Sequence, residues 1–234
     1  ATKSMENEGE KMLKEQLEKV RGQMPLIHNI TNYVTVNDCA NILLACGGSP
    51  IMADDLEEAE EITAVCGGLN INIGTLNRNT IPSMLAAGKK ANACGHPVLL
   101  DPVGAGASRL RTETARRLLK EVHFTAIRGN ISEIKTLALG MGGARGVDAD
   151  GMDAVTDANL ESTILFAGRF AEDTGAIVAI TGAIDIVTDG DFSYVIRNGH
   201  PLMSKVTGTG CMLSAMMTAY LTANQEQPLE AAAA

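Results

Sequence analysis

The sequence predicts an α/β fold of three layers, in which helices cover both faces of a mostly parallel central sheet and an antiparallel hairpin lies near one edge. Short apolar runs alternate with helical stretches along most of the chain, which is the pattern of strands joined by crossover helices. The alternation stops near the end, where two β-rich runs flank Asp189-Gly190-Asp191. An Asp-Gly pair between such runs is a strong hairpin signal.

Strands are predicted where short apolar runs stand between turn residues. They cover residues 25–30, 50–53, 69–73, 97–100, 124–127 and 177–180, and the hairpin pairs 184–188 with 192–197. Helices are predicted at about 6–21, from Asn32 to Cys46, from the capping pair Asp54-Asp55 to Gly67, and at 80–94, 112–122, 130–139, 158–173 and 212–221.

The length of 234 residues and the 45% hydrophobic content predict a single domain over residues 1–234. Residues 228–234 have the pattern of a helix that ought to continue. We therefore expect one or two further C-terminal helices that this sequence does not include.

The acidic composition narrows the class of partner. A net charge of −9 disfavours nucleic acid and anionic membranes, and an aromatic content of 3% offers few platforms for stacked bases. The five cysteines form no C-x-x-C pair, which suits a reduced compartment, and Cys39, Cys46, Cys66 and Cys94 are interpreted as core residues. Without a leader or an apolar run of about 18 residues, a cytoplasmic protein is expected.

The most informative stretch is Thr207-Gly208-Thr209-Gly210-Cys211, which runs into an apolar helix. Glycines let backbone N–H groups approach an anion, and a helix N-terminus adds partial positive charge. Gly208, Thr209, Gly210 and Cys211 are therefore a candidate anion hole, with Cys211 placed to act as a base or a nucleophile. A plain helix start with a buried cysteine is an equally good interpretation of this stretch taken alone.

Polar residues also follow three predicted strands. Asp101 ends one strand and could hold Mg²⁺ or a ribose, although a structural turn explains it too. Asn130 and Glu133 could order a hydrated Mg²⁺ beside Arg128, or simply form a helix capping box. Thr181 could lend a hydroxyl to a phosphate. Because the carboxyl ends of parallel strands meet at one edge of a sheet, these groups together predict one site.

With these residues assembled, the sequence resembles the hydroxyethylthiazole kinase family of ribokinase-like proteins. The resemblance runs from Pro25 onward. It is carried by IHNITN at 27–32, SPIMA at 49–53, NIGTL at 72–76, LDPVGAGA at 100–107, IRGNISE at 127–133, ITG at 180–182 and KVTGTGC at 205–211.

The resemblance implies a role for each matching residue. Cys211 would be the base, where ribokinase-like enzymes usually carry aspartate, and Arg128 and Thr181 would bind the co-substrate ATP. Asp101 and Glu133 would organise Mg²⁺. Met52 and Gly208 would contact a thiazole alcohol, with Asn32 nearby. The family also implies a homotrimer with sites at subunit borders, in which Met52 and Asn32 serve a neighbour's Cys211.

Three alternatives stay open from the sequence. A hydroxymethylpyrimidine kinase is the nearest change of substrate. In a hydrolase, Cys211 would be a covalent nucleophile, although His28, His96, His123 and His200 offer no obvious partner by spacing. A non-catalytic binding protein on the same fold would be expected to carry a degenerate site.

Overall fold

The computed structural model describes residues 2–140 and 154–234, of which residues 2–10 are described by their backbone alone. Its strands form one sheet in the order β2-β1-β3-β4-β5-β6-β7-β8. Their bounds are β1 Leu26–Ile30, β2 Ser49–Met52, β3 Gly68–Asn72, β4 Val98–Asp101, β5 Ala126–Gly129, β6 Ile177–Ile180, β7 Asp185–Thr188 and β8 Ser193–Ile196.

The pairing of the strands confirms the predicted α/β fold class. Strands β1 to β6 run parallel to their neighbours, whereas β7 pairs antiparallel with β6 and β8 antiparallel with β7. The hairpin of β7 and β8 forms one end of the sheet, as the Asp-Gly turn predicted. All carboxyl ends of the parallel strands therefore lie along one edge.

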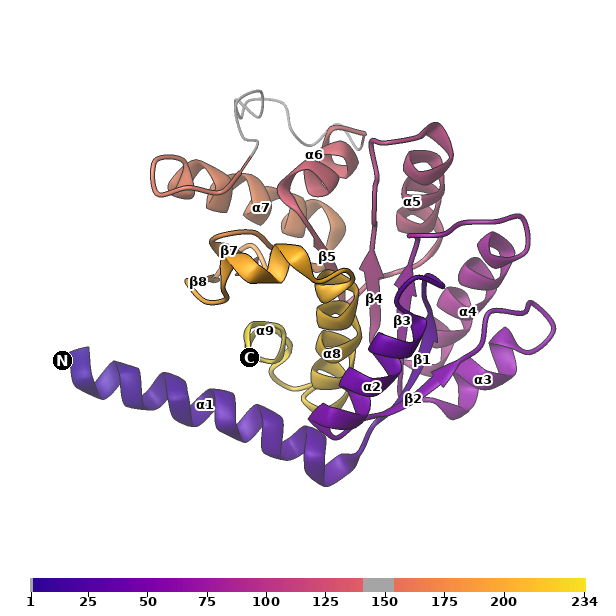
Figure 1. Cartoon of the computed structure of the whole chain (residues 1–234), viewed down its shortest axis with the longest axis horizontal. Coiled ribbons are helices and arrows are strands. Elements are labelled where there is room, and N and C mark those ends of the chain that lie inside the picture. Colours follow the sequence, from indigo (N-terminus) through magenta and orange to yellow (C-terminus); the bar gives the residue numbers. More distant parts are fainter. Residues whose placement is uncertain (1, 141–153) are drawn as a thin grey trace.

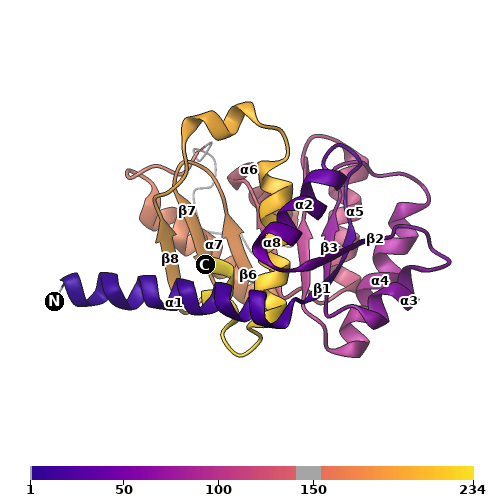
Figure 2. The same cartoon turned by 60° about the horizontal axis from the view of Figure 1, so that its bottom comes forward.

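Helices cover both faces of the sheet (Figures 1 and 2). Helices α1, α2, α8 and α9 lie on one face, and α3 to α7 cover the other. Their bounds are α1 Thr2–Gln23, α2 Val36–Cys46, α3 Ala59–Val65, α4 Thr80–Cys94, α5 Arg109–Glu121, α6 Ile131–Gly140, α7 Leu160–Thr174, α8 Thr209–Ala223 and α9 Pro228–Ala233. A short 3₁₀ helix, Pro201–Lys205, precedes α8.

Two apolar clusters hold the layers together, because successive side chains of a buried strand point to opposite faces. Leu99 belongs to the cluster under α8 and α2, whereas its neighbour Leu100 belongs to the cluster under α4 to α7. Both residues are completely buried. The alternation explains why the parallel strands read as continuous apolar runs in the sequence.

Several predicted boundaries were wrong, and two of them have a clear local cause. Helix α3 begins at Ala59 rather than after Asp55, because the Asp55 carboxylate accepts the N–H of Glu57 and closes a turn first. Strand β5 lies two residues further along than predicted, because pairing with β6 extends it through Arg128 and Gly129. Apolar content alone could not predict that a charged residue belongs to the strand.

The cysteines are all unpaired, and Cys39, Cys46 and Cys66 are buried as predicted. Burial raises the pKa of both Cys39 and Cys66 to about 11, so these two thiols stay protonated near neutral pH. Cys94 is exposed at the end of α4, so its interpretation as a core residue was wrong. None of the helices in the described ranges is long and apolar enough to span a membrane.

Candidate active site

The candidate site lies where the carboxyl ends of β3, β4, β5 and β6 meet the N-terminus of α8. Asn72 ends β3 and pairs in register with Asp101, which ends β4. Arg128 lies in β5, and Thr181 directly follows β6. The sheet therefore brings together the strand-end residues that the sequence singled out.

Helix α8 begins at the predicted glycine cradle. Gly208 caps the helix with a φ of +80°, which glycine adopts without strain, and a side chain there would collide with Thr35. The first N–H groups of a helix have no partner within it, so those of Thr209, Gly210 and Cys211 can meet an anion. Helix α8 starts three residues earlier than predicted, with this cradle as its first turn.

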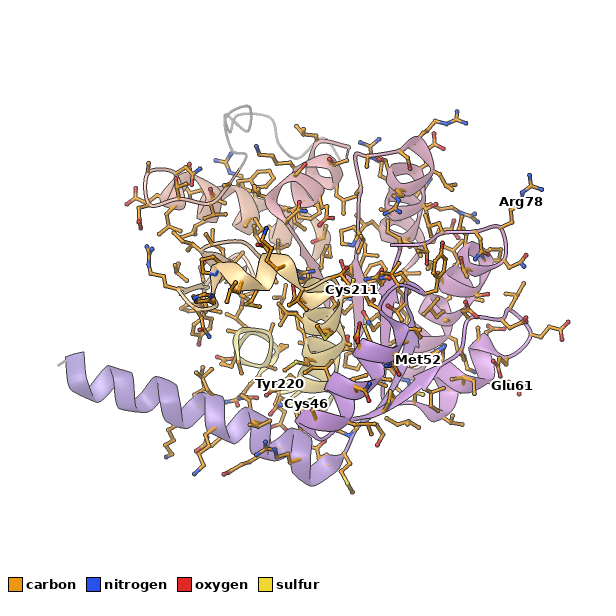
Figure 3. The ribbon with its side chains drawn as sticks, in the orientation of Figure 1. Cys46, Met52, Glu61, Arg78, Cys211 and Tyr220 are labelled. Carbon is orange, nitrogen blue, oxygen red and sulfur yellow. The ribbon has the colours of Figure 1, made fainter. Side chains whose placement is uncertain are left out.

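Cys211 is half-buried in the first turn of α8, and two side-chain amides contact its sulfur. Asn32 Nδ2 and Asn72 Nδ2 each lie 3.2 Å from Cys211 Sγ. In Figure 3, Cys211 lies at the start of α8, while Tyr220 of the same helix lies toward its far end beside Cys46. The sulfur is thus at the carboxyl edge of the sheet with hydrogen-bond donors around it.

Asp101 is completely buried beneath the start of α8. Its Oδ2 accepts hydrogen bonds from Asn72 Nδ2 at 2.8 Å and from Ser214 Oγ at 2.7 Å, and Arg128 Nη1 lies 3.7 Å away. Burial raises the pKa of Asp101, while the charge of Arg128 and the bond from Ser214 act in the opposite direction. Its Oδ1 is buried and has no hydrogen-bond partner among the described residues.

Arg128 lies beside the glycine cradle. Its Nη2 donates to Thr181 Oγ1 at 2.5 Å, and a Cβ at Gly210 would stand only 2.5 Å from its Nη1. The side chain is 12% exposed, so water screens its charge only weakly beside the cradle. The guanidinium and the N-terminus of α8 therefore present positive potential to the same region, which suits a polyphosphate.

The capping box at the start of α6 is present in the structure. Asn130 Oδ1 accepts the N–H of Glu133, and Glu133 Oε2 accepts the N–H of Asn130. Glu133 Oε1 also accepts the N–H of Gly104, in the loop that follows Asp101. The carboxylate of Glu133 thus ties that loop to α6, and its remaining lone pairs are those available to a cation.

Met52 ends β2, on the far side of β1 from the cradle, and is partly buried (Figure 3). The next residue, Ala53, is held by His28, whose Nε2 lies 2.7 Å from the Ala53 carbonyl oxygen. His28 Nδ1 lies 2.9 Å from the Thr63 hydroxyl. Burial lowers the pKa of His28, which favours the neutral ring. Its hydrogen bond to Ala53 holds the end of β2 in place.

The structure differs from the sequence interpretation in two respects. Asn32 contacts the Cys211 of its own chain, whereas it was expected to serve a neighbouring subunit. Asn72 and Ser214 were not singled out, although they bond Asp101 directly. Asn70 and Asn72 alternate in an otherwise apolar strand, and that unusual pattern of buried amides was the signal available for Asn72.

Comparison with known proteins agrees with this geometry. The model of the hydroxyethylthiazole kinase family matches residues 17–234. A hydroxyethylthiazole kinase from Clostridium acetobutylicum is 69% identical over 220 residues, which are 94% of this chain and 81% of that protein. The structure of hydroxyethylthiazole kinase from Pyrococcus horikoshii has a TM-score of 0.84 and 39% identity, covering 95% of this chain and 80% of that one.

A more distant structure shows the fold alone. A ribokinase-like superfamily protein from Enterococcus faecalis has a TM-score of 0.58 at 11% identity, covering 89% of this chain and 75% of that one. The sheet with its edge hairpin is therefore a ribokinase-like architecture. Because the family model matches nearly the whole chain and close relatives carry the same name, the chain belongs to the hydroxyethylthiazole kinase family.

Proposed function

We propose that the protein transfers the γ-phosphoryl group of ATP to the primary alcohol of 4-methyl-5-(2-hydroxyethyl)thiazole, a thiamine precursor. Membership of the family and the names of its relatives support this activity. One observation of the structure carries the proposal. A cysteine sulfur with two amide donors lies in the first turn of a glycine-capped helix, beside an arginine and a buried aspartate.

Cys211 Sγ is the proposed base. It accepts the hydroxyl proton of the substrate while the hydroxyl oxygen forms a bond to the γ-phosphorus. The bond from the γ-phosphorus to the bridging oxygen breaks, and its electron pair leaves with ADP. A positioned base contributes typically 10²–10⁴-fold, so most of the acceleration must come from positioning and electrostatics.

The proposed electrostatic part is supplied by the cradle and Arg128. Backbone N–H groups of Gly208 to Cys211 face the transferring phosphoryl group, and Arg128 with Thr181 binds the rest of the triphosphate. The contact between Arg128 and Thr181 supports this pairing, as does the packing of the guanidinium against Gly210. Met52, Gly208 and Asn32 are proposed to bound the thiazole alcohol.

Magnesium fits the carboxylates of the site. Mg²⁺ binds proteins through one or two carboxylates together with substrate phosphates. The buried, unpartnered Oδ1 of Asp101 is an acceptor of that kind, with Glu133 the second ligand. When bound there, the ion would neutralise charge on the phosphates. Within the described residues no group of three or more His, Cys, Asp or Glu side chains could hold a metal by itself, so the phosphates are needed to complete the site.

We also propose the homotrimer that the resemblance implies. Strand β2 is the end strand of the sheet that the described residues form. Tyr33 is 77% exposed, and Val34 and Leu56 are exposed close in sequence to Asn32 and Met52. An apolar surface next to substrate-binding residues suits a subunit border. Light scattering in solution would give the mass of the assembly, and a monomeric mass would contradict the trimer.

The kinase proposal is tested by mixing the protein with ATP, Mg²⁺ and the thiazole alcohol, and measuring ADP and the phosphorylated product by mass spectrometry. Hydroxymethylpyrimidine in parallel reactions tests the alternative substrate. We expect kcat/KM to be highest for the thiazole alcohol. Preference for the pyrimidine would contradict the substrate assignment. If no ADP formed with either alcohol, the kinase activity itself would be contradicted.

The geometry of Cys211 also bears on the hydrolase alternative. A nucleophilic cysteine is activated by a neighbouring base, or by a helix N-terminus that stabilises negative charge on its sulfur. The hydrogen-bond partners of its sulfur within the described residues are two asparagines, while His28 and His200 are engaged elsewhere. His96 and His123 line a pocket formed with Asn92 and Pro228, residues at the opposite end of the strands. Among the described residues no histidine therefore contacts Cys211, and a covalent nucleophile would depend on the N-terminus of α8 alone. Mass spectrometry for a covalent acyl adduct on Cys211 separates the two functions.

A further inference from the structure

Asn72 is the one amide that contacts both Cys211 and Asp101 among the described residues. Its Nδ2 lies 2.8 Å from Asp101 Oδ2 and 3.2 Å from Cys211 Sγ. Its Oδ1 accepts the backbone N–H of Gly74 at 2.9 Å. Because a backbone N–H can only donate, the orientation of the Asn72 amide is fixed. Its two N–H hydrogens therefore point to the carboxylate and to the sulfur.

Asn32 is oriented by the same reasoning. Its Nδ2 lies 3.0 Å from Asn72 Oδ1, which must be an acceptor, and its Oδ1 accepts the hydroxyl of Thr35 at 3.1 Å. The second hydrogen on Asn32 Nδ2 is then directed at Cys211 Sγ. Both amides donate to the sulfur. Neither offers an acceptor for a thiol hydrogen.

Hydrogen bonds received by a charged atom are stronger than those received by a neutral one. Two donors on one sulfur therefore hold it in one position and stabilise negative charge that it carries. Asn72 and Asn32 are almost fully buried, being 1% and 4% exposed, so water cannot replace them at low cost. An amide also suits the place between Asp101 and the sulfur, because a carboxylate there would repel both.

We propose that Asn72 and Asn32 form a two-donor clamp that holds Cys211 Sγ as a proton acceptor, and that Asn72 ties the position of this sulfur to Asp101. The inference rests on the proposed kinase function and deepens it. Asn72 is a positioning residue for the reaction because it acts through the sulfur. Asp101 faces the phosphates in the proposed function. The amide of Asn72 then holds Asp101 and the base Cys211 at a fixed separation.

A double-mutant cycle tests the clamp. Asn72→Ala is made in the native protein and in Cys211→Ala, and kcat and the KM for the thiazole alcohol are measured. In the native protein we expect kcat to fall roughly 10- to 100-fold, the range for loss of a hydrogen bond to a charged group, with little change in KM. In Cys211→Ala the same change should cost less than about 3-fold, since residues that act as a unit are not additive.

The matched control is Asn70→Ala. Asn70 is a buried asparagine on the same face of β3, and its amide donates to Asn29 rather than to the site. We expect kcat to be unchanged in this variant. Equal losses for Asn72→Ala in both cysteine backgrounds would overturn the clamp, because they would show that Asn72 acts through Asp101 alone. If Asn72→Ala does not fold, Asn32→Ala replaces it in the same cycle, because this variant removes a donor to Cys211 and leaves the contacts of Asp101 intact.

A second measurement does not depend on turnover. Iodoacetamide labelling at neutral pH is followed at each cysteine by mass spectrometry, with the exposed Cys94 as internal reference. Asn72→Ala should slow labelling of Cys211 relative to Cys94 several-fold, because the sulfur loses a donor that stabilises its negative charge during attack on the reagent. Unchanged or faster labelling of Cys211 would overturn the clamp. An inactive native protein whose labelling still responds to Asn72→Ala would overturn the kinase function and leave the clamp standing.

Discussion

The two halves of the carboxyl edge are built from different chemistry. Around Cys211, which we call the sulfur half, the contacts come from the neutral amides of Asn32 and Asn72. The charged half consists of Asp101, Arg128 and Glu133. Asp101 is met by Arg128 and Ser214, and Glu133 accepts backbone N–H groups. Asn72 belongs to both halves.

The difference separates two tasks of a phosphoryl transfer. The proton acceptor has to be held in position, and the neutral amides of Asn32 and Asn72 do this without a direct ion pair to the sulfur. Phosphates need positive charge, which Arg128 and the N-terminus of α8 supply. Substitutions in the sulfur half should therefore lower kcat, whereas those in the charged half should first weaken binding of ATP.

Cys211→Ala is expected to have the largest effect. Removing the base should lower kcat by about 10²–10⁴-fold. The dissociation constant for ATP should stay the same, because the cradle and Arg128 remain. Steady-state kinetics and calorimetric ATP titration measure the two quantities. Cys211→Asp should keep substantial activity, since its carboxylate is ionised at neutral pH and can accept the same proton. Full activity in Cys211→Ala would make the base assignment wrong.

Arg128→Ala should have the next largest effect, on the charged half. Loss of a hydrogen-bonded charge costs about 1.5–3 kcal/mol, so the KM for ATP should rise roughly 10- to 150-fold. The variant should also unfold at lower urea concentration, because Asp101 is left buried without its cation.

Arg117→Ala is the matched control for Arg128→Ala. Arg117 pairs with Glu121 on the exposed face of α5, and surface pairs contribute little. Its KM for ATP should equal that of the native protein. If Arg128→Ala lost stability but kept the native KM, Arg128 would be only the counter-ion of Asp101.

Much of the fold follows from the apolar pattern of the sequence. Helix α4 and strand β6 have the predicted limits, because each is bounded by clear turn or capping residues. The apolar pattern fails where a strand includes a charged residue of the candidate site. Strand β5 extends through Arg128, which apolar content assigns to a loop. That the chain forms a single domain stays a prediction.

The candidate site divides in the same way. Strand ends and the glycine cradle predict Asp101, Arg128, Thr181 and Cys211, because those positions share one edge whatever the order of the strands. Asn72 and Ser214 could not be assigned roles this way. Their contacts with Asp101 depend on β3 lying next to β4, and on which face of α8 rests on β4. Lateral adjacency of this kind is set by tertiary packing.

His28→Gln should have the smallest effect, and it concerns the end of β2, where Met52 lies outside both halves. Burial lowers the pKa of His28 below its ordinary 6.5. Below pH 6.5 the unfolded chain therefore binds a proton at His28 more readily than the folded protein does. Stability from this residue is present above pH 6.5 and is lost as pH falls toward the lowered pKa, by at most about 1.4 kcal/mol per pH unit.

Urea unfolding of the native protein and of His28→Gln between pH 7.5 and 5.5, roughly one unit either side of the ordinary value, measures that slope. The native protein should lose more stability than the variant as pH falls, because glutamine binds no proton. In the variant, the KM for the thiazole alcohol should rise modestly, since Ala53 and hence Met52 are held less firmly, while kcat stays the same. Parallel stability curves would mean that His28 can take up a proton in the folded protein. A lower kcat would contradict a role limited to its contacts with Ala53 and Thr63.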